Sequence, residues 1–386
     1  MKINIFPIVS SLHSQEVISN QTKELLEELK KESGHEINIV DASKLYDADL
    51  SLILIQSGGS EQLILENIDK LHEPFYLLTY GTNNSLAASL EILSYLKDNN
   101  LKGEVLHGSN SYLVKRINQL LENKEYRYGV IGHPSDWLIA SNVDYKEAKR
   151  LHNISLIDID INKVIDYYKQ VDQVVDASKY DFNQEEVKKA LVLKRALDKI
   201  VEENKLDGLT IRCFSILNPL KTTACLGLSL LNKDKIIGTC EGDIPSMISM
   251  HVLKKVTGQI GFQANPSRID VENKKIIFAH CTLPFDMSYE NTFKTHFESN
   301  SGVAIKGKLK EGKVTIFKLS RNLKDYFVET GTLVRNLDEE NLCRTQIEIK
   351  LDDNISYFLT RPYGNHHLII YGDHKQELID YMSKIS

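Results

Sequence analysis

Three residues whose side chains could bind a metal or transfer protons follow short apolar runs in the stretch 236–284. Glu241 follows residues 236–240, Asn265 follows residues 261–264, and His280 closes the run 276–279. The order strand, turn, helix, strand, hairpin, strand predicts that they lie at three neighbouring strand ends. Strand ends in an α/β framework open onto one edge of the sheet, where ligands bind. We therefore predict an active site at this edge.

Glu241 also has a structural interpretation. Asp243 is a good helix N-cap and Pro245 suits a first helical turn, so Glu241 precedes a predicted helix at its positive end. A carboxylate there would compensate the helix dipole. The pattern supports this interpretation and a catalytic one about equally.

The histidines are ambiguous when each is taken alone. A single histidine such as His280 is more often a hydrogen-bonded core residue than a ligand. His366 and His367 are adjacent at the start of a predicted strand. Because adjacent residues on a strand point to opposite faces, only one of the two could enter a common site.

Two further residues lie where strands are predicted to end. The loop 132–142, GHPSDWLIASN, carries the only tryptophan, Trp137. Loops after strands often carry function, although a large aromatic side chain can also simply pack its loop. Arg212 closes another predicted strand, where a buried positive charge would need an anionic or polar partner.

The elements that must position these residues alternate between strands and helices up to residue 265, which predicts parallel, doubly wound sheets. We interpret the N-terminal run as a first strand and not a signal peptide, because Pro7 interrupts it. After Pro284, apolar and polar residues alternate in segments separated by turns, which predicts an antiparallel barrel or sandwich. The predicted fold class is α/β, with two doubly wound Rossmann-like α/β domains followed by a β-rich, barrel-like domain. The predicted boundaries are 1–125, 126–265 and 266–386.

The composition is that of an ordinary globular protein, with 42% hydrophobic and 26% charged residues among 386. A net charge of −6 without a long basic run argues against nucleic-acid and anionic-membrane partners. No apolar stretch reaches transmembrane length. Five cysteines without a CxxC pair indicate reduced thiols and a cytoplasmic location.

Four segments taken in order resemble the L-fucose isomerase and L-arabinose isomerase superfamily: GTCEGDIPSM, TGQIGFQANP, FAHCTLP and GNHHLIIYGDH. The resemblance covers essentially the whole chain, although the chain is short for the family, and no segment is diagnostic alone. It implies aldose–ketose isomerisation through an enediolate, with a divalent metal, typically Mn²⁺. It also implies a homo-oligomer, a trimer or hexamer, with sites formed between subunits.

The same resemblance implies roles for the residues above. Glu241 matches both an acidic metal ligand and the proton-transferring residue. The implied metal ligands are Glu241, Asn265, His280 and His366, with His367 as the less favoured alternative to His366. Arg212, Thr282 and Asn365 fall at positions resembling sugar contacts, and the loop position of Trp137, described above, makes it a further expected sugar contact.

Asn265 departs from the family, because one branch has an aspartate at this position. An amide oxygen can bind a hard cation, but it brings no charge and cannot act as a base. Glu241 would then have to act as the base alone, or with Asp243 or a metal-bound hydroxide. The sequence therefore favours a sugar isomerase but leaves two alternatives open. One is a metal-dependent carbohydrate lyase, epimerase or aldolase-like enzyme, and the other is a non-catalytic sugar-binding protein.

Overall fold

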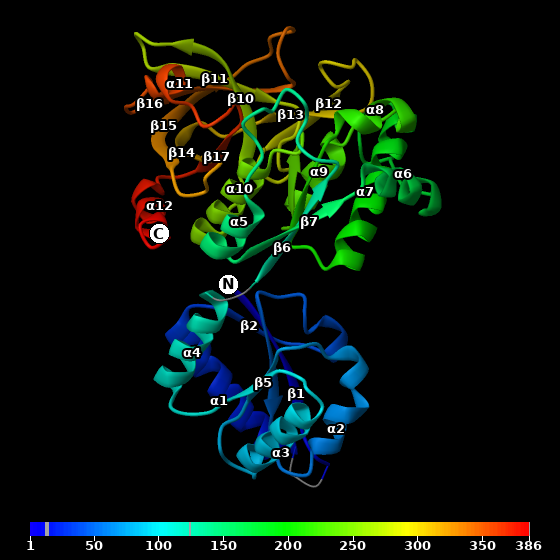
Figure 1. Ribbon diagram of the computed structural model, residues 1–386, viewed down its shortest axis with the longest axis vertical. Helices are drawn as coiled ribbons and strands as arrows, with labels where there is room; N and C mark the ends of the chain where they lie inside the picture. Colours follow the sequence, from blue (N-terminus) through cyan, green and yellow to red (C-terminus); the bar gives the residue numbers. More distant parts are fainter. Residues whose placement is uncertain (12–14, 123–124, 386) are drawn as a thin grey trace. The chain divides into compact units, whose positions relative to one another are not determined.

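The computed structural model describes residues 1–11, 15–122 and 125–385. The chain divides into two compact units, residues 1–124 and 125–386 (Figure 1). The predicted boundary after residue 265 falls inside a strand of the second unit, β10 (Phe262–Asp270).

The first unit is a parallel sheet between two layers of helices. Its strands are ordered β2-β1-β3-β4-β5. One core layer lies between the sheet and α1 and α4, and the other lies against α2 and α3. The bounds are β1 Lys2–Ile8, α1 Gln15–Ser33, β2 Glu36–Ile39, η1 Ala42–Lys44, β3 Leu50–Ile55, α2 Glu61–Glu66, η2 Ile68–Lys70, β4 Phe75–Leu78, α3 Ser85–Asp98, β5 Gly103–Leu106 and α4 Asn110–Glu122.

The second unit begins with another parallel sheet, ordered β7-β6-β8-β9. Apolar side chains of α6 to α9 cover one face and those of α5 and α10 the other. The bounds are β6 Tyr126–Ile131, α5 Tyr145–His152, β7 Ile154–Ile159, α6 Ile161–Gln170, α7 Gln184–Asn204, β8 Gly208–Ile211, α8 Phe214–Leu220, α9 Cys225–Lys233, β9 Ile237–Cys240 and α10 Ile244–Thr257.

The rest of the second unit is a closed antiparallel barrel, in the order β10-β11-β16-β15-β14-β17, with a separate hairpin of β12 and β13. Alternate apolar residues of the strands fill its interior. The remaining bounds are β11 Lys275–His280, β12 Glu290–Lys294, β13 Ala304–Lys308, β14 Gly312–Leu319, β15 Tyr326–Asn336, β16 Thr345–Leu351, α11 Tyr357–Thr360, β17 His367–Tyr371 and α12 Lys375–Met382. The predicted parallel sheets and barrel are thus confirmed in outline.

Two expectations about the strand ends are wrong. Glu241 follows a strand of the parallel sheet, whereas His280 ends a strand of the barrel, so the predicted neighbours belong to two different sheets. Asn265 lies within β10 and not after it. The strand continues through Pro266 because its ladder with β11 shifts register between Pro266 and Arg268, and such an irregularity accommodates a proline.

Among the described residues, no single helix has the length and apolar composition needed to cross a membrane. The pair α8 and α9 meets those criteria only when taken together, and it is bent by 117°.

Candidate active site

Glu241 begins a sharp turn between β9 and α10. Its backbone φ is +64° and that of Gly242 is +71°, so two consecutive residues are left-handed. For a non-glycine residue this costs roughly 1–2 kcal/mol, a strain that is typical of functional sites. A side chain at position 242 would begin 2.3 Å from the carbonyl oxygen of His133, so glycine is required there. The turn therefore holds the Glu241 carboxylate in a fixed place beyond the strand.

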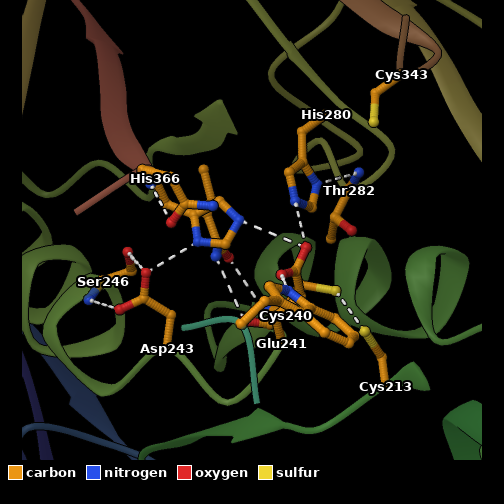
Figure 2. Close-up of polar contacts among 12 residues, drawn as sticks. Cys213, Cys240, Glu241, Asp243, Ser246, His280, Thr282, Cys343 and His366 are labelled. Carbon is orange, nitrogen blue, oxygen red and sulfur yellow. Dashed lines mark hydrogen bonds and ion pairs between the residues drawn. The ribbon is translucent and has the colours of Figure 1, made fainter. Parts of the chain in front are cut away.

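Glu241, His280 and His366 converge in the second unit (Figure 2). Glu241 Oε1 lies 3.6 Å from His366 Nε2 and 3.8 Å from His280 Nε2. One ligand atom from each residue lies within 4.8 Å of the other two, so the three could hold a metal ion. All three residues are buried. The second expected histidine, His367, is turned away and its Nε2 contacts the Tyr357 hydroxyl at 3.1 Å.

A carboxylate orients His366 from behind. His366 Nδ1 lies 2.9 Å from Asp243 Oδ2, so Nδ1–H donates to the carboxylate and Nε2 faces Glu241. A carboxylate behind a metal-binding histidine fixes the ring and its tautomer in many metal sites. Asp243 is also the N-cap of α10, accepting from the Ser246 backbone N–H at 3.0 Å, as predicted.

Asp243 is paired with a buried lysine. Lys318 Nζ lies 3.2 Å from Asp243 Oδ2 and 2.7 Å from Ser246 Oγ, and both charged side chains are at most 1% exposed. Burial lowers the pKa of Lys318. For Asp243, burial would raise the pKa, but Lys318 and His366 hold it well below its usual value. The carboxylate stays ionised, and each of its oxygens has a partner.

The loop 132–142 contacts the other oxygen of Glu241. The Trp137 indole N–H donates to Glu241 Oε2 at 2.7 Å, and Trp137 is 53% exposed. Arg212 supports this loop, because its guanidinium donates to the Pro134 carbonyl at 3.0 Å and pairs with Asp136. Arg212 therefore has the anionic partner that its position required.

Asn265 supplies an unpaired oxygen beside this cluster. Its neighbour Ala264 pairs with His367 in the β10–β17 ladder, so the register brings Asn265 next to His366. Asn265 Oδ1 and His366 Nε2 are buried, and neither has a hydrogen-bond partner among the described residues. Unpaired buried polar atoms are costly unless something binds them. An amide oxygen, an imidazole nitrogen and a carboxylate oxygen are suitable ligands for Mn²⁺, so the donor set fits a divalent metal.

His280 fits less well as a ligand. The backbone N–H of Thr282 donates to His280 Nδ1 at 3.2 Å. An Nδ1 that accepts a hydrogen bond leaves the proton of the neutral ring on Nε2, the atom that faces Glu241. In this arrangement His280 donates toward the site, and it could bind a metal through Nε2 only by giving up the Thr282 bond.

The cluster stabilises opposite charges. Burial would raise the pKa of Glu241, but His280 and His366 hold it well below its usual value. Burial lowers the pKa of His366, yet the Asp243 and Glu241 carboxylates raise it to about 9. Glu241 is therefore a carboxylate at neutral pH, and a cation bound at His366 Nε2 would replace a proton.

The remaining expected sugar contacts lie at different depths. Thr282 is buried, and its backbone binds His280, whereas Asn365 is exposed and accepts from the His366 backbone N–H at 2.9 Å. Our sequence analysis missed Lys318. The available signal was a lysine in the alternating interior positions of β14, after Val314 and Ile316.

No family model matches the chain. It is similar to proteins named sulfoquinovose isomerase from Priestia aryabhattai and Priestia megaterium, with 27% identity over 294 residues for each. These alignments cover 69% of this chain and 65% of each relative, so the chain spans about two thirds of the curated relatives' length. A protein of the same name from Alkalicoccus urumqiensis is 28% identical over 137 residues, covering 34% of this chain and 31% of the relative.

Proposed function

We propose that this protein is a metal-dependent aldose–ketose isomerase of the fucose and arabinose isomerase superfamily, acting on a sulfonated aldose such as sulfoquinovose. The superfamily and the reaction class come from the four-segment resemblance, and the names of the similar proteins support the substrate class.

One observation carries the proposal. Glu241 Oε1 lies 3.6 Å from His366 Nε2 and 3.8 Å from His280 Nε2, and among the described residues neither His366 Nε2 nor the buried Asn265 amide oxygen has a hydrogen-bond partner. A site that only stabilised the fold would pair these atoms with one another or with the backbone. The turn at Glu241 is also held in a strained conformation, which a stabilising role does not require.

Glu241 Oε1, Asn265 Oδ1 and His366 Nε2 would hold the metal. When bound, a divalent cation such as Mn²⁺ supplies polarisation of the carbonyl and hydroxyl oxygens of an open-chain sugar. The carboxylate–histidine pair of Asp243 and His366 keeps Nε2 directed at the site. Trp137 holds Oε2 of Glu241, so Oε1 is the oxygen left for the metal.

The reaction moves a proton between two adjacent carbons through an enediolate. Glu241 is the base in our proposal, because Asp243 is completely buried and both of its oxygens are paired. Glu241 accepts the proton from one carbon through Oε2, the oxygen not assigned to the metal, and returns it to the neighbouring carbon. His280 carries a proton on Nε2, which it can give to the sugar's carbonyl oxygen, and it recovers a proton from the hydroxyl that becomes the new carbonyl. In this role His280 is not a metal ligand.

A substrate screen tests the function. Protein stripped with a chelator and then reloaded with Mn²⁺ is assayed with neutral, phosphorylated and sulfonated aldoses, sulfoquinovose among them. We expect the ketose to form from the sulfonated aldose, to disappear without metal and to return with Mn²⁺. Cleavage or epimerisation would favour the other enzyme classes, and binding without conversion would favour a sugar-binding protein.

We also propose a cytoplasmic homo-oligomer, a trimer or hexamer. All five cysteines are free thiols, as expected in a reducing compartment. In the loop 132–142, Ile139 is 89% exposed, and it lies two residues from Trp137, so a subunit contact there would border the site. Light scattering should give the mass of three or six chains, and a fully active monomer would contradict this assembly.

A further inference from the structure

A second group of potential metal ligands lies apart from the cluster around Glu241. Cys281, Glu298 and Cys343 each offer an atom within 4.8 Å of the other two. Cys343 Sγ lies 3.5 Å from Glu298 Oε1. Cys281 is 2% exposed, and Phe297 and Cys343 pack around it.

The fold brings these three residues together from three segments. Cys281 directly follows β11, and Cys343 lies two residues before β16. His280 pairs with Thr345 at the end of the ladder between these strands, and just past this end the thiols of Cys281 and Cys343 lie within 4.8 Å of each other. Glu298 comes from the loop between β12 and β13. A bound ion would therefore tie that loop to the end of the barrel.

A neighbouring side chain orients the carboxylate of this group. His296 Nε2 lies 3.0 Å from Glu298 Oε2, which leaves Oε1 directed at Cys343. One carboxylate oxygen is thus held by a neighbour, and the other faces the thiols.

We propose that Cys281, Cys343 and Glu298 form a zinc site. Two thiolates and a carboxylate select a borderline-soft ion over Mn²⁺, for which the oxygen and nitrogen donors around Glu241 are better suited. Each thiol releases one proton when Zn²⁺ binds. Three protein ligands leave one position for water. The site braces the β12–β13 loop against the segment that carries His280.

Cobalt substitution tests this site without relying on activity. Reduced, metal-free protein is titrated with Co²⁺, which gives a sulfur-to-metal charge-transfer absorption only where thiolates bind it. We expect this band at one equivalent in the wild type, its loss in Cys343→Ser and its retention in Cys213→Ser. The last variant is a matched control, because Cys213 is a buried thiol that contacts Cys240 and not this group.

The absence of a charge-transfer band in the wild type, or an unchanged band in Cys343→Ser, would overturn the proposal. A Cys281–Cys343 disulfide that forms in the presence of metal would also overturn it. If Cys343→Ser does not fold, Glu298→Gln decides, because the Glu298 side chain is 44% exposed and its replacement spares the core. The affinity for Zn²⁺, measured by its displacement of Co²⁺, should then fall on the order of tenfold or more. An unchanged affinity would contradict the site.

Discussion

The two oxygens of Glu241 face surroundings of different kinds. On the Oε1 side, His366 is supported by Asp243 and Lys318, and all three side chains are at most 1% exposed. On the Oε2 side, the partner is Trp137, which is 53% exposed on a loop. The buried side is fixed by paired charges before any ligand binds. The exposed side is held by the side-chain hydrogen bond from Trp137, and in our proposal the sugar enters on this side.

The largest effect on activity is expected from replacing Glu241 itself, whose two oxygens face the two sides. Glu241→Gln keeps the shape of the side chain but removes the negative charge and the base. We expect kcat to fall about 10²–10⁴-fold, the usual contribution of a general base. Steady-state assays measure this loss, and circular dichroism should show an unchanged fold. Near-native activity in a folded Glu241→Gln protein would remove Glu241 from the mechanism.

The next largest effect is expected on metal affinity, from a substitution on the buried side. Asp243→Asn removes the charge that orients His366, so Mn²⁺ affinity should fall by about 10–100-fold in a titration. Lys318→Met is the comparison variant, because it breaks the same buried pair but leaves the Asp243–His366 contact in place. It should lower the free energy of unfolding by roughly 3–5 kcal/mol. Wild-type Mn²⁺ affinity in folded Asp243→Asn would show that His366 needs no support.

A smaller effect is expected on the exposed side. Trp137→Phe keeps an aromatic ring but loses the hydrogen bond to Glu241. Since a hydrogen bond to a charged group contributes about 1.5 kcal/mol, kcat should fall about tenfold. Asn142→Ala at the end of the same loop is the control and should leave kcat unchanged, because Asn142 is exposed and its amide oxygen accepts from the adjacent Val143 backbone N–H. Equal effects of the two substitutions would mean that the loop matters and the hydrogen bond does not.

The smallest effect is expected on metal affinity in a variant that tests whether Asn265 is a metal ligand. Asn265→Asp adds a carboxylate beside the proposed metal, so Mn²⁺ affinity should rise by up to about tenfold, or 1.4 kcal/mol. Isomerase activity should persist or increase. Tighter metal binding with lower activity would indicate a reaction other than isomerisation. A calorimetric affinity within about 0.5 kcal/mol of the wild type would place Asn265 outside the ligand set.

The fold could be predicted where apolar residues recur at a regular spacing along a long segment. Helix α7, Gln184–Asn204, belongs to the predicted alternation of strands and helices, and its buried stripe repeats over many turns. The short elements α5, α8, β12 and α11 have eight residues or fewer, too few to show such a repeat. Helix α8 has seven residues and contains Pro219, so local sequence does not favour a helix. Packing against neighbouring elements fixes such segments.

The candidate site could be predicted only in part, for the same physical reason. The turn at Glu241, the cap at Asp243 and the opposite faces of His366 and His367 follow from local rules. The contacts that define the site are not local. Glu241 and Trp137 are 104 residues apart, and Asp243 and Lys318 are 75 apart. A single sequence does not encode such pairs as a pattern, since they arise from how the sheet and the barrel pack.

Anomalous diffraction from Mn²⁺ in crystals grown with the proposed sugar tests the central claim most directly. The account predicts an anomalous peak about 2.0–2.6 Å from Glu241 Oε1, Asn265 Oδ1 and His366 Nε2, with the sugar beside it. An active protein whose Mn²⁺ lies elsewhere, or whose sugar binds away from Glu241, would contradict the account.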